Sequence, residues 1–140
     1  MKATQGQIDY CNILKTTTRA SYNAIGKVNC PVLGSDIGFN SIGFRHLLYK
    51  PDGTPRDIKE IIYKLILFPL VVPVILNALG VDEERKVTIR DRRGKKFKMK
   101  NGKTIALVAE VGRKKPVRVR VLILQLDGAP NPIFYSVMKD

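Results

Sequence analysis

The residues best suited to chemistry in this chain are basic, and one pair of them lies on a predicted strand. Valine and arginine alternate through Val117–Val121. Because strand side chains point alternately to opposite faces, Arg118 and Arg120 are expected to stand on the open face while the valines pack under helices. Two planar guanidinium groups can clamp a phosphate. Further cations lie on the predicted strands or in the connections between them: Arg90, Arg92, Arg93, Lys114 and Lys115. These neighbours favour a phosphate-binding role for the pair over an ordinary solvated face.

His46 is the only histidine of the chain. Imidazole is the side chain whose unperturbed pKa lies closest to neutrality, so His46 is the candidate for proton transfer. It follows Arg45, which could add a phosphate contact, and a glycine-rich segment. The alternative is that His46 is a structural polar residue without a chemical role.

The last predicted strand offers hydroxyl groups, and an earlier strand offers one acid. Ser136 is a small polar residue among apolar neighbours and is a candidate phosphate ligand, whereas Tyr135 is a candidate for stacking on a base. Adjacent strand residues face opposite sides, so only one of the two can face a given site. Glu110 is interpreted as the salt-bridge partner of a nearby arginine, with a general base as the alternative.

Several motifs for other chemistries are missing from the sequence. It contains no glycine-rich phosphate loop ending in Lys-Ser/Thr, no cluster of carboxylates suited to magnesium and no nucleophile elbow. An enzyme built from this chain and acting on nucleic acid is therefore expected to use no metal and no cofactor. Metal-free cleavage favours RNA, because the 2′-hydroxyl supplies the nucleophile.

The positive charge is concentrated in the second half of the chain. The 140 residues, enough for one domain, carry a net charge of +13. From Lys86 to Asp140 there are 15 Lys and Arg against four acids, whereas Pro51–Arg85 has four basic and six acidic residues. A basic half beside a nearly neutral, apolar half is typical of a protein that holds a polyanion, and RNA or DNA is the leading candidate.

Helices are predicted in the first part of the chain. Residues 1–26 are expected to form a helical or partly ordered extension to a domain at 27–140, with the threonines at 16–18 ending the first element. After a short extended piece and a glycine-rich loop, a helix is expected to begin with Thr54 as N-cap and Pro55 at its first position. Pro69 should end or kink it, before a second short helix at 70–79.

Strands are predicted from residue 86 onward, because the apolar period there changes from helical to alternating. The expected strands are 86–92, 95–100, 104–112, 117–126 and 132–138, and Asn101-Gly102 predicts a hairpin turn. Helices followed by an antiparallel meander indicate an α+β fold.

Cysteine content and hydropathy indicate a cytoplasmic protein without an integral membrane segment. Cys11 and Cys30 are too few for a disulfide framework and suit a reducing compartment, and the N-terminus is too polar for a secretory signal. The apolar run Leu65–Leu76 is interrupted by two prolines and falls short of the roughly 20 residues that a membrane span needs. A core helix is therefore expected. A peripheral membrane protein, with Lys95–Lys103 on anionic lipid, is a further alternative.

Three segments together resemble a known family of domains. They are Val28–Leu33, Gly43–Leu47, and the paired hairpins ending in Lys115–Val121 and Phe134–Met138. In this respect the chain, from about Lys27 to Lys139, is similar to phage-associated nuclease-like domains, grouped in one superfamily with barnase, EndoU, the tRNase colicins and RelE-type toxins. The resemblance implies N-terminal helices packed on a C-terminal four-stranded antiparallel sheet.

The resemblance also implies an activity, a metal-independent, toxin-like endoribonuclease that cleaves tRNA or rRNA by transesterification. His46 would act as acid or base, Arg118 and Arg120 would stabilise the charge on the phosphate, and Ser136 would bond a phosphate oxygen. No second proton-transfer group is evident except Glu110. An acidic antitoxin or immunity protein would be the partner. The alternative is a non-catalytic module that binds nucleic acid through the same basic sheet face.

Overall fold

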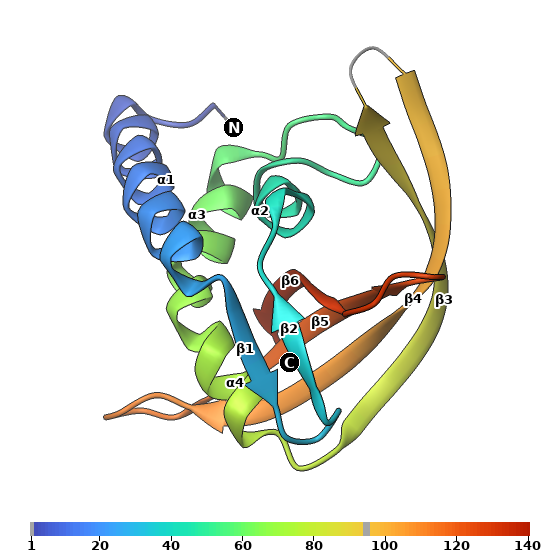
Figure 1. The fold of residues 1–140 in the computed structure, drawn as a ribbon. Coiled ribbons are helices and arrows are strands. Elements are labelled where there is room, and N and C mark those ends of the chain that lie inside the picture. Colours follow the sequence, from blue (N-terminus) through green and yellow to red (C-terminus); the bar gives the residue numbers. More distant parts are fainter. Residues whose placement is uncertain (1, 94–95) are drawn as a thin grey trace.

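A computed structural model describes residues 2–93 and 96–140, with the backbone alone for 91–93. Helices come first and long strands follow (Figure 1). The elements are α1 (Gln5–Ile25), β1 (Lys27–Cys30), β2 (Ser35–Gly38), α2 (Ser41–Leu48), α3 (Ile58–Leu67), the 3₁₀ turn η1 (Phe68–Leu70), α4 (Val71–Asn77), β3 (Val81–Arg93), β4 (Lys96–Val111), β5 (Val117–Leu126) and β6 (Ile133–Lys139). The α+β class expected from the sequence is confirmed.

The sheet is larger and less regular than the expected four antiparallel strands. It has six strands in the order β1-β2-β6-β5-β4-β3. All neighbours are antiparallel except β2 and β6, which run parallel and meet at Gly38 and Ile133. The predicted extended piece near residue 27 is the first strand of a short hairpin, and its second strand occupies part of the predicted glycine loop. This hairpin adds to the last strand of the chain and makes the sheet mixed.

The hairpin turn predicted at Asn101-Gly102 is wrong, because β4 runs through both residues without a break. Asn101 lies opposite Thr88 on β3, whose hydroxyl donates to the Asn101 amide oxygen over 2.9 Å. Gly102 is needed for close packing, because a Cβ at this position would lie 2.5 Å from the carbonyl oxygen of Gln125 on β5. The glycine therefore marks where a third strand approaches β4, and the reversal of the chain falls between β3 and β4.

α1, α3 and α4 lie close to their predicted positions, with two corrections, whereas α2 was not predicted as a helix, because a glycine-rich loop was expected where it begins. α3 begins at Ile58 with Asp57 at its N-cap, rather than at Pro55 after Thr54. α1 continues past the threonines to Ile25, since the hydroxyls of Thr16 and Thr17 donate back to the carbonyls of the preceding turn. Within the described residues no helix is long and apolar enough to span a membrane.

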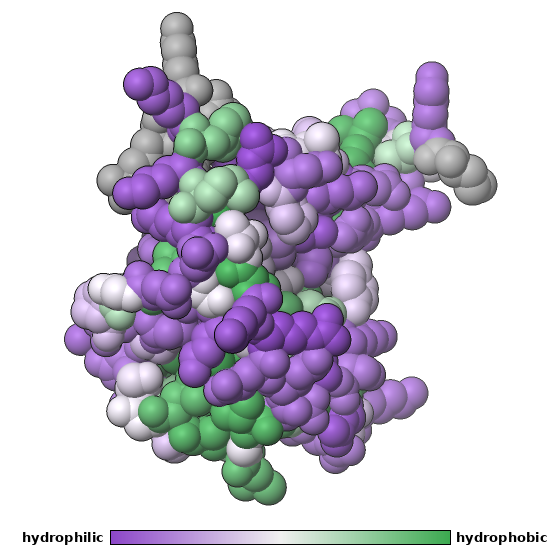
Figure 2. All heavy atoms as spheres, turned by 90° about the vertical axis from the view of Figure 1, so that its right-hand side faces the viewer, coloured by the Kyte–Doolittle hydropathy of each residue, from purple (hydrophilic) through white to green (hydrophobic). Residues whose placement is uncertain are grey.

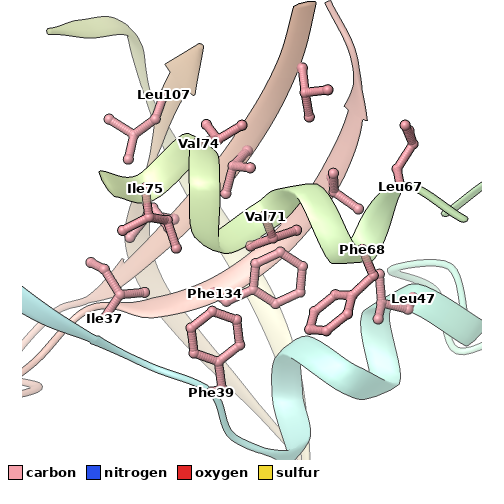
Figure 3. Close-up of a cluster of buried hydrophobic side chains, with 14 of the residues drawn as sticks. Ile37, Phe39, Leu47, Leu67, Phe68, Val71, Val74, Ile75, Leu107 and Phe134 are labelled. Carbon is pink, nitrogen blue, oxygen red and sulfur yellow. The ribbon is translucent and has the colours of Figure 1, made fainter. Parts of the chain in front are cut away.

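Aromatic rings fill the space between the helices and the sheet. Figure 3 shows α4 crossing the strands, with the rings of Phe39, Phe68 and Phe134 gathered at one end of the cluster. Phe39 and Phe134 are stacked with their centroids 5.3 Å apart, and the ring of Tyr22 from α1 packs against all three. Because these rings come from a helix, a turn and strand ends that are distant in sequence, the core ties α1, η1 and β6 together.

A glycine sets the distance between α2 and β6. Gly43 of α2 packs so closely on the backbone of Phe134 that a Cβ would collide with the Phe134 carbonyl oxygen and would lie 2.6 Å from the Tyr22 hydroxyl. Tyr22 donates to the carbonyl of Asn40, the residue that caps α2, over 2.5 Å. This close contact brings the next residues of α2, including His46, onto the last strand.

Candidate nucleic-acid interface

His46 lies half-buried on α2 and contacts the last strand. Its ring stacks on Tyr135 of β6, with centroids 4.0 Å apart and planes inclined by 16°. The β5–β6 pairing shifts register at this point, so that Leu122 and Ile123 face Ser136 and Phe134 and leave Tyr135 as the extra residue of a bulge. Tyr135 is thus used for stacking on His46.

Arg56 binds His46 at two atoms. Its Nε donates to the His46 carbonyl over 2.9 Å, and its Nη2 lies 3.2 Å from His46 Nε2. Arg56 also pairs with Glu60 of α3 at 2.5 Å, and the arginine side chain is only 8% exposed. Because a guanidinium can only donate, Nε2 must be the acceptor nitrogen and the ring proton belongs on Nδ1.

This environment keeps the imidazole neutral. Burial, and then the nearby cations Arg56 and Lys64, lower the pKa of His46 to about 3. At neutral pH His46 therefore has no extra proton to give, and its acceptor nitrogen is occupied. Its role as acid or base stays a prediction, and Arg56 would have to leave Nε2 before a proton could be accepted there.

Ser136 lies beside this cluster but points to a buried lysine. The Nζ atom of Lys64 on α3 donates to Ser136 Oγ over 3.0 Å and to the carbonyl of Val137 over 3.1 Å. Ser136 and Lys64 are 2% and 6% exposed. Burial lowers the pKa of Lys64 to about 8, helped by Arg56 and opposed by Glu60. In this arrangement the serine hydroxyl is closed to a phosphate from solvent.

Arg118 and Arg120 lie on the open face of β5. They alternate with Val119 and Val121, which are fully buried under the helices. Both arginines have carboxylate partners. Arg118 pairs with Asp140 at 2.6 Å, and Arg120 pairs with Asp82 at 2.7 Å and with Asp140 at 3.2 Å. The structure therefore does not bring the arginine pair together with His46 and Ser136, and the charge of the pair is largely balanced.

The remaining predicted residues lie at separate places. Arg45 of α2 is exposed and its guanidinium lies 4.7 Å from the ring centre of Tyr49. Glu110 is the cross-strand neighbour of Arg118. Its carboxylate helps to raise the pKa of Arg118, although Asp140 and Asp82 have larger effects. Lys114 and Lys115 are exposed in the turn between β4 and β5. Arg92 and Arg93 lie on β3, and their side chains fall outside the described part.

A basic hairpin projects from the sheet at the opposite end of β4 from this turn. The pairing of β4 with β5 ends at Gly102, and the Asn101 carbonyl still accepts from the backbone N–H of Asp127, so residues 96–100 of β4 pair only with residues 89–93 of β3. These two segments form what we call the β arm, which rises beside α2 in Figure 1. From Arg90 to Lys100 the sequence has seven Lys and Arg and one acid.

The two faces of the β arm differ in chemistry. Cross-strand partners share a face, so Arg90, Met99 and Phe97 lie on one face and Lys96, Lys98 and Lys100 on the other. Phe97 and Met99 are 51% and 57% exposed. The arm thus carries two exposed apolar side chains on one face and a row of lysines on the other.

Arg56 and Lys64 were missed from the sequence, although both shape the site. Lys64 interrupts the apolar helical face between Ile61 and Leu65, and a lysine in such a position is a usable sign of a buried ammonium. Arg56 lies in the turn before α3 and gives no comparable sign.

Among residues 2–93 and 96–140, no group of three or more His, Cys, Asp or Glu side chains is placed to hold a metal ion. No protein-family model, curated protein or solved structure matches the chain.

Proposed function

We propose that this protein binds nucleic acid through the β arm. The single observation that carries the proposal is the pair of exposed lysines, Lys96 and Lys98, on one face of a projecting two-stranded ribbon. Within the part whose side chains are described, no carboxylate lies within 4.0 Å of either lysine ammonium. Two such cations attract a polyanion, because phosphate contacts release condensed counterions.

Part of the charge elsewhere on the sheet is paired with carboxylates. On the lower half of β3, Glu83 pairs with Arg85 and Glu84 pairs with Lys103. Figure 2, which faces the side of the β3–β4 hairpin, shows a largely hydrophilic surface with a large apolar patch at its lower end and smaller ones above it. The proposal therefore moves the expected interface from the arginine pair of β5 to the β arm.

Anisotropy of labelled oligonucleotides at several salt concentrations tests this assignment. The double variant Lys96→Ala/Lys98→Ala should bind more weakly than the native protein, and the slope of log affinity against log salt should fall by about two, or roughly one per lost phosphate contact. The matched control is Lys114→Ala/Lys115→Ala, which removes the same charge at the other end of β4. Equal weakening by both double variants would show only a general effect of net charge and would contradict the assignment.

A metal-independent endoribonuclease is a second candidate, favoured by one observation. The fold places His46, Tyr135 and Ser136 side by side with the cations Arg56 and Lys64. In such an enzyme Arg56 would release the imidazole on substrate binding and turn to the phosphate. An acidic antitoxin or immunity protein would then cover the basic surface.

Cleavage of total tRNA and ribosomal RNA in EDTA separates the two candidates. Fragments ending in 2′,3′-cyclic phosphate, absent with His46→Ala and retained with the exposed control Lys59→Ala, are expected of the nuclease. Thermal melting of both variants checks that each is folded. RNA that stays intact while salt-sensitive binding persists would reject the nuclease and leave the binding module.

A further inference from the structure

The apolar face of the β arm has no role in a purely electrostatic contact. Phe97 and Met99 lie two residues apart on the same strand and each has more than half of its surface exposed. The lysines of the opposite face would be enough to bind phosphates. Two exposed apolar side chains within a strongly basic ribbon indicate a ligand that is both anionic and apolar, and stacked base pairs between phosphate backbones have this combination.

Arg90 holds the phenylalanine ring in place. Its guanidinium carbon lies 4.3 Å from the centre of the Phe97 ring, and its Nη1 donates to the carbonyl of Asp52 over 3.3 Å. The Asp52 carboxylate accepts from the backbone and hydroxyl of Thr54, which fixes the turn that supplies this carbonyl. The ring is thus backed by a tethered cation, so it loses less side-chain freedom when it is inserted between other groups.

We propose that the β arm enters the minor groove of duplex DNA and wedges Phe97 and Met99 between base pairs, while Lys96 and Lys98 bind the flanking phosphates. This inference rests on the proposed nucleic-acid binding and names its substrate. The minor groove of B-form DNA is about 6 Å wide, too narrow for a ribbon of two strands about 4.8 Å apart with their side chains. Apolar wedges that unstack a base step open this groove and kink the duplex.

Two other nucleic acids fit the β arm less well. Proteins that grip single strands stack successive bases on several aromatic rings, whereas Phe97 is the one aromatic residue in the sequence of the arm. Duplex RNA presents 2′-hydroxyls across its wide minor groove, and a pair of apolar side chains offers them no hydrogen-bond partner. Duplex DNA is therefore the occupant that the chemistry of the arm favours.

The test is a 20-base-pair DNA duplex with donor and acceptor dyes at its ends and a flexible TA step at its centre. The native protein should shorten the distance between the dyes. The variant Phe97→Ala/Met99→Ala should bind about tenfold more weakly with an unchanged salt slope, because its lysines remain, and should no longer shorten that distance. The matched variant Lys96→Gln/Lys98→Gln should lower the salt slope and still shorten the distance at saturation.

The contrary outcomes separate this inference from the proposed function. Equal shortening by the native protein and by Phe97→Ala/Met99→Ala would overturn the wedge. Tighter binding to a matched RNA duplex or single strand than to the DNA duplex would overturn the substrate and leave nucleic-acid binding intact. Absence of binding to all three nucleic acids at low salt would overturn the proposed function itself.

Discussion

Lys64 carries an ammonium group that is almost entirely inside the protein. The side chain is 6% exposed, its two hydrogen-bond partners are neutral oxygens, and the nearest acid, Glu60, is engaged by Arg56. Burial therefore penalises the charged form and lowers the pKa of Lys64 from 10.5 to about 8. Replacing the lysine by methionine, which has a similar shape and no charge, isolates the effect of this ionisation on stability.

The sign of the effect follows from proton linkage. Between about pH 8 and pH 10.5 the unfolded chain keeps a proton on Lys64 that the folded protein has lost, so the free energy of unfolding rises with pH in this window. At pH 7 both states are protonated and the penalty is fully present. With about 1.36 kcal/mol per pKa unit, the contribution of Lys64 should improve by about 2.5 kcal/mol between pH 7 and pH 10.

Urea unfolding followed by circular dichroism at pH 7, 8, 9 and 10 measures this difference. The native protein should gain about 2.5 kcal/mol relative to Lys64→Met across the series. Loss of the hydrogen bond to Ser136 lowers the free energy of unfolding of the variant by a similar amount at every pH. The readout is therefore how the difference in this free energy between the native protein and Lys64→Met changes with pH. Lys59→Met, at an exposed lysine of the same helix, is the control and should follow the native protein. If the free energy of unfolding changed with pH in the same way for the native protein and for Lys64→Met, the lowered pKa of a buried Lys64 ammonium would be refuted.

Three further substitutions test the packing that positions the site, each by urea unfolding. Gly43→Ala should lower the free energy of unfolding by about 3 kcal/mol, because the added Cβ collides with the backbone of β6. The control is Gly6→Ala, at an exposed position of α1, which should be neutral or stabilising. Tyr22→Phe should cost about 1 kcal/mol, since the carbonyl of Asn40 loses its donor; an unchanged midpoint would contradict this. Gly102→Ala should cost about 2 kcal/mol and weaken hydrogen-exchange protection where β4 meets β5, and unaltered protection would contradict the close approach.

Elements with a strong local pattern were predicted well. The alternation of valine and arginine in β5 and the apolar spacing of α3 each determine a buried face on their own. β1 and β2 were missed as sheet strands because each has only four residues. The pairing of β2 with β6 joins Gly38 to Ile133, residues far apart in the chain, which no local pattern records. The false turn at Asn101-Gly102 has the same origin, because its glycine serves a third strand rather than a reversal.

The candidate site was predictable by residue type and less so by arrangement. His46 and Ser136 were found because their side chains are rare in their surroundings, but their contacts are with Arg56 and Lys64, which the sequence did not single out. Arg118 and Arg120 were placed on the open face, yet the carboxylates that pair with them come from the starts and ends of other strands. A charge counted along a sequence is thus not a charge available to a ligand.

The position of the last strand has a consequence for how the protein is made. β6 lies inside the sheet, between β2 and β5, and supplies Phe134 and Val137 to the core. Until residues 133–139 have left the ribosome, β2 has no strand to join and α2 lacks the strand on which Gly43 and His46 pack. The helices and the β3–β5 meander are then joined through α4, but the apolar faces that β6 covers stay exposed, a state prone to aggregation. A pause in translation before β6 would prolong this state, so rapid synthesis of β6 would protect the nascent chain.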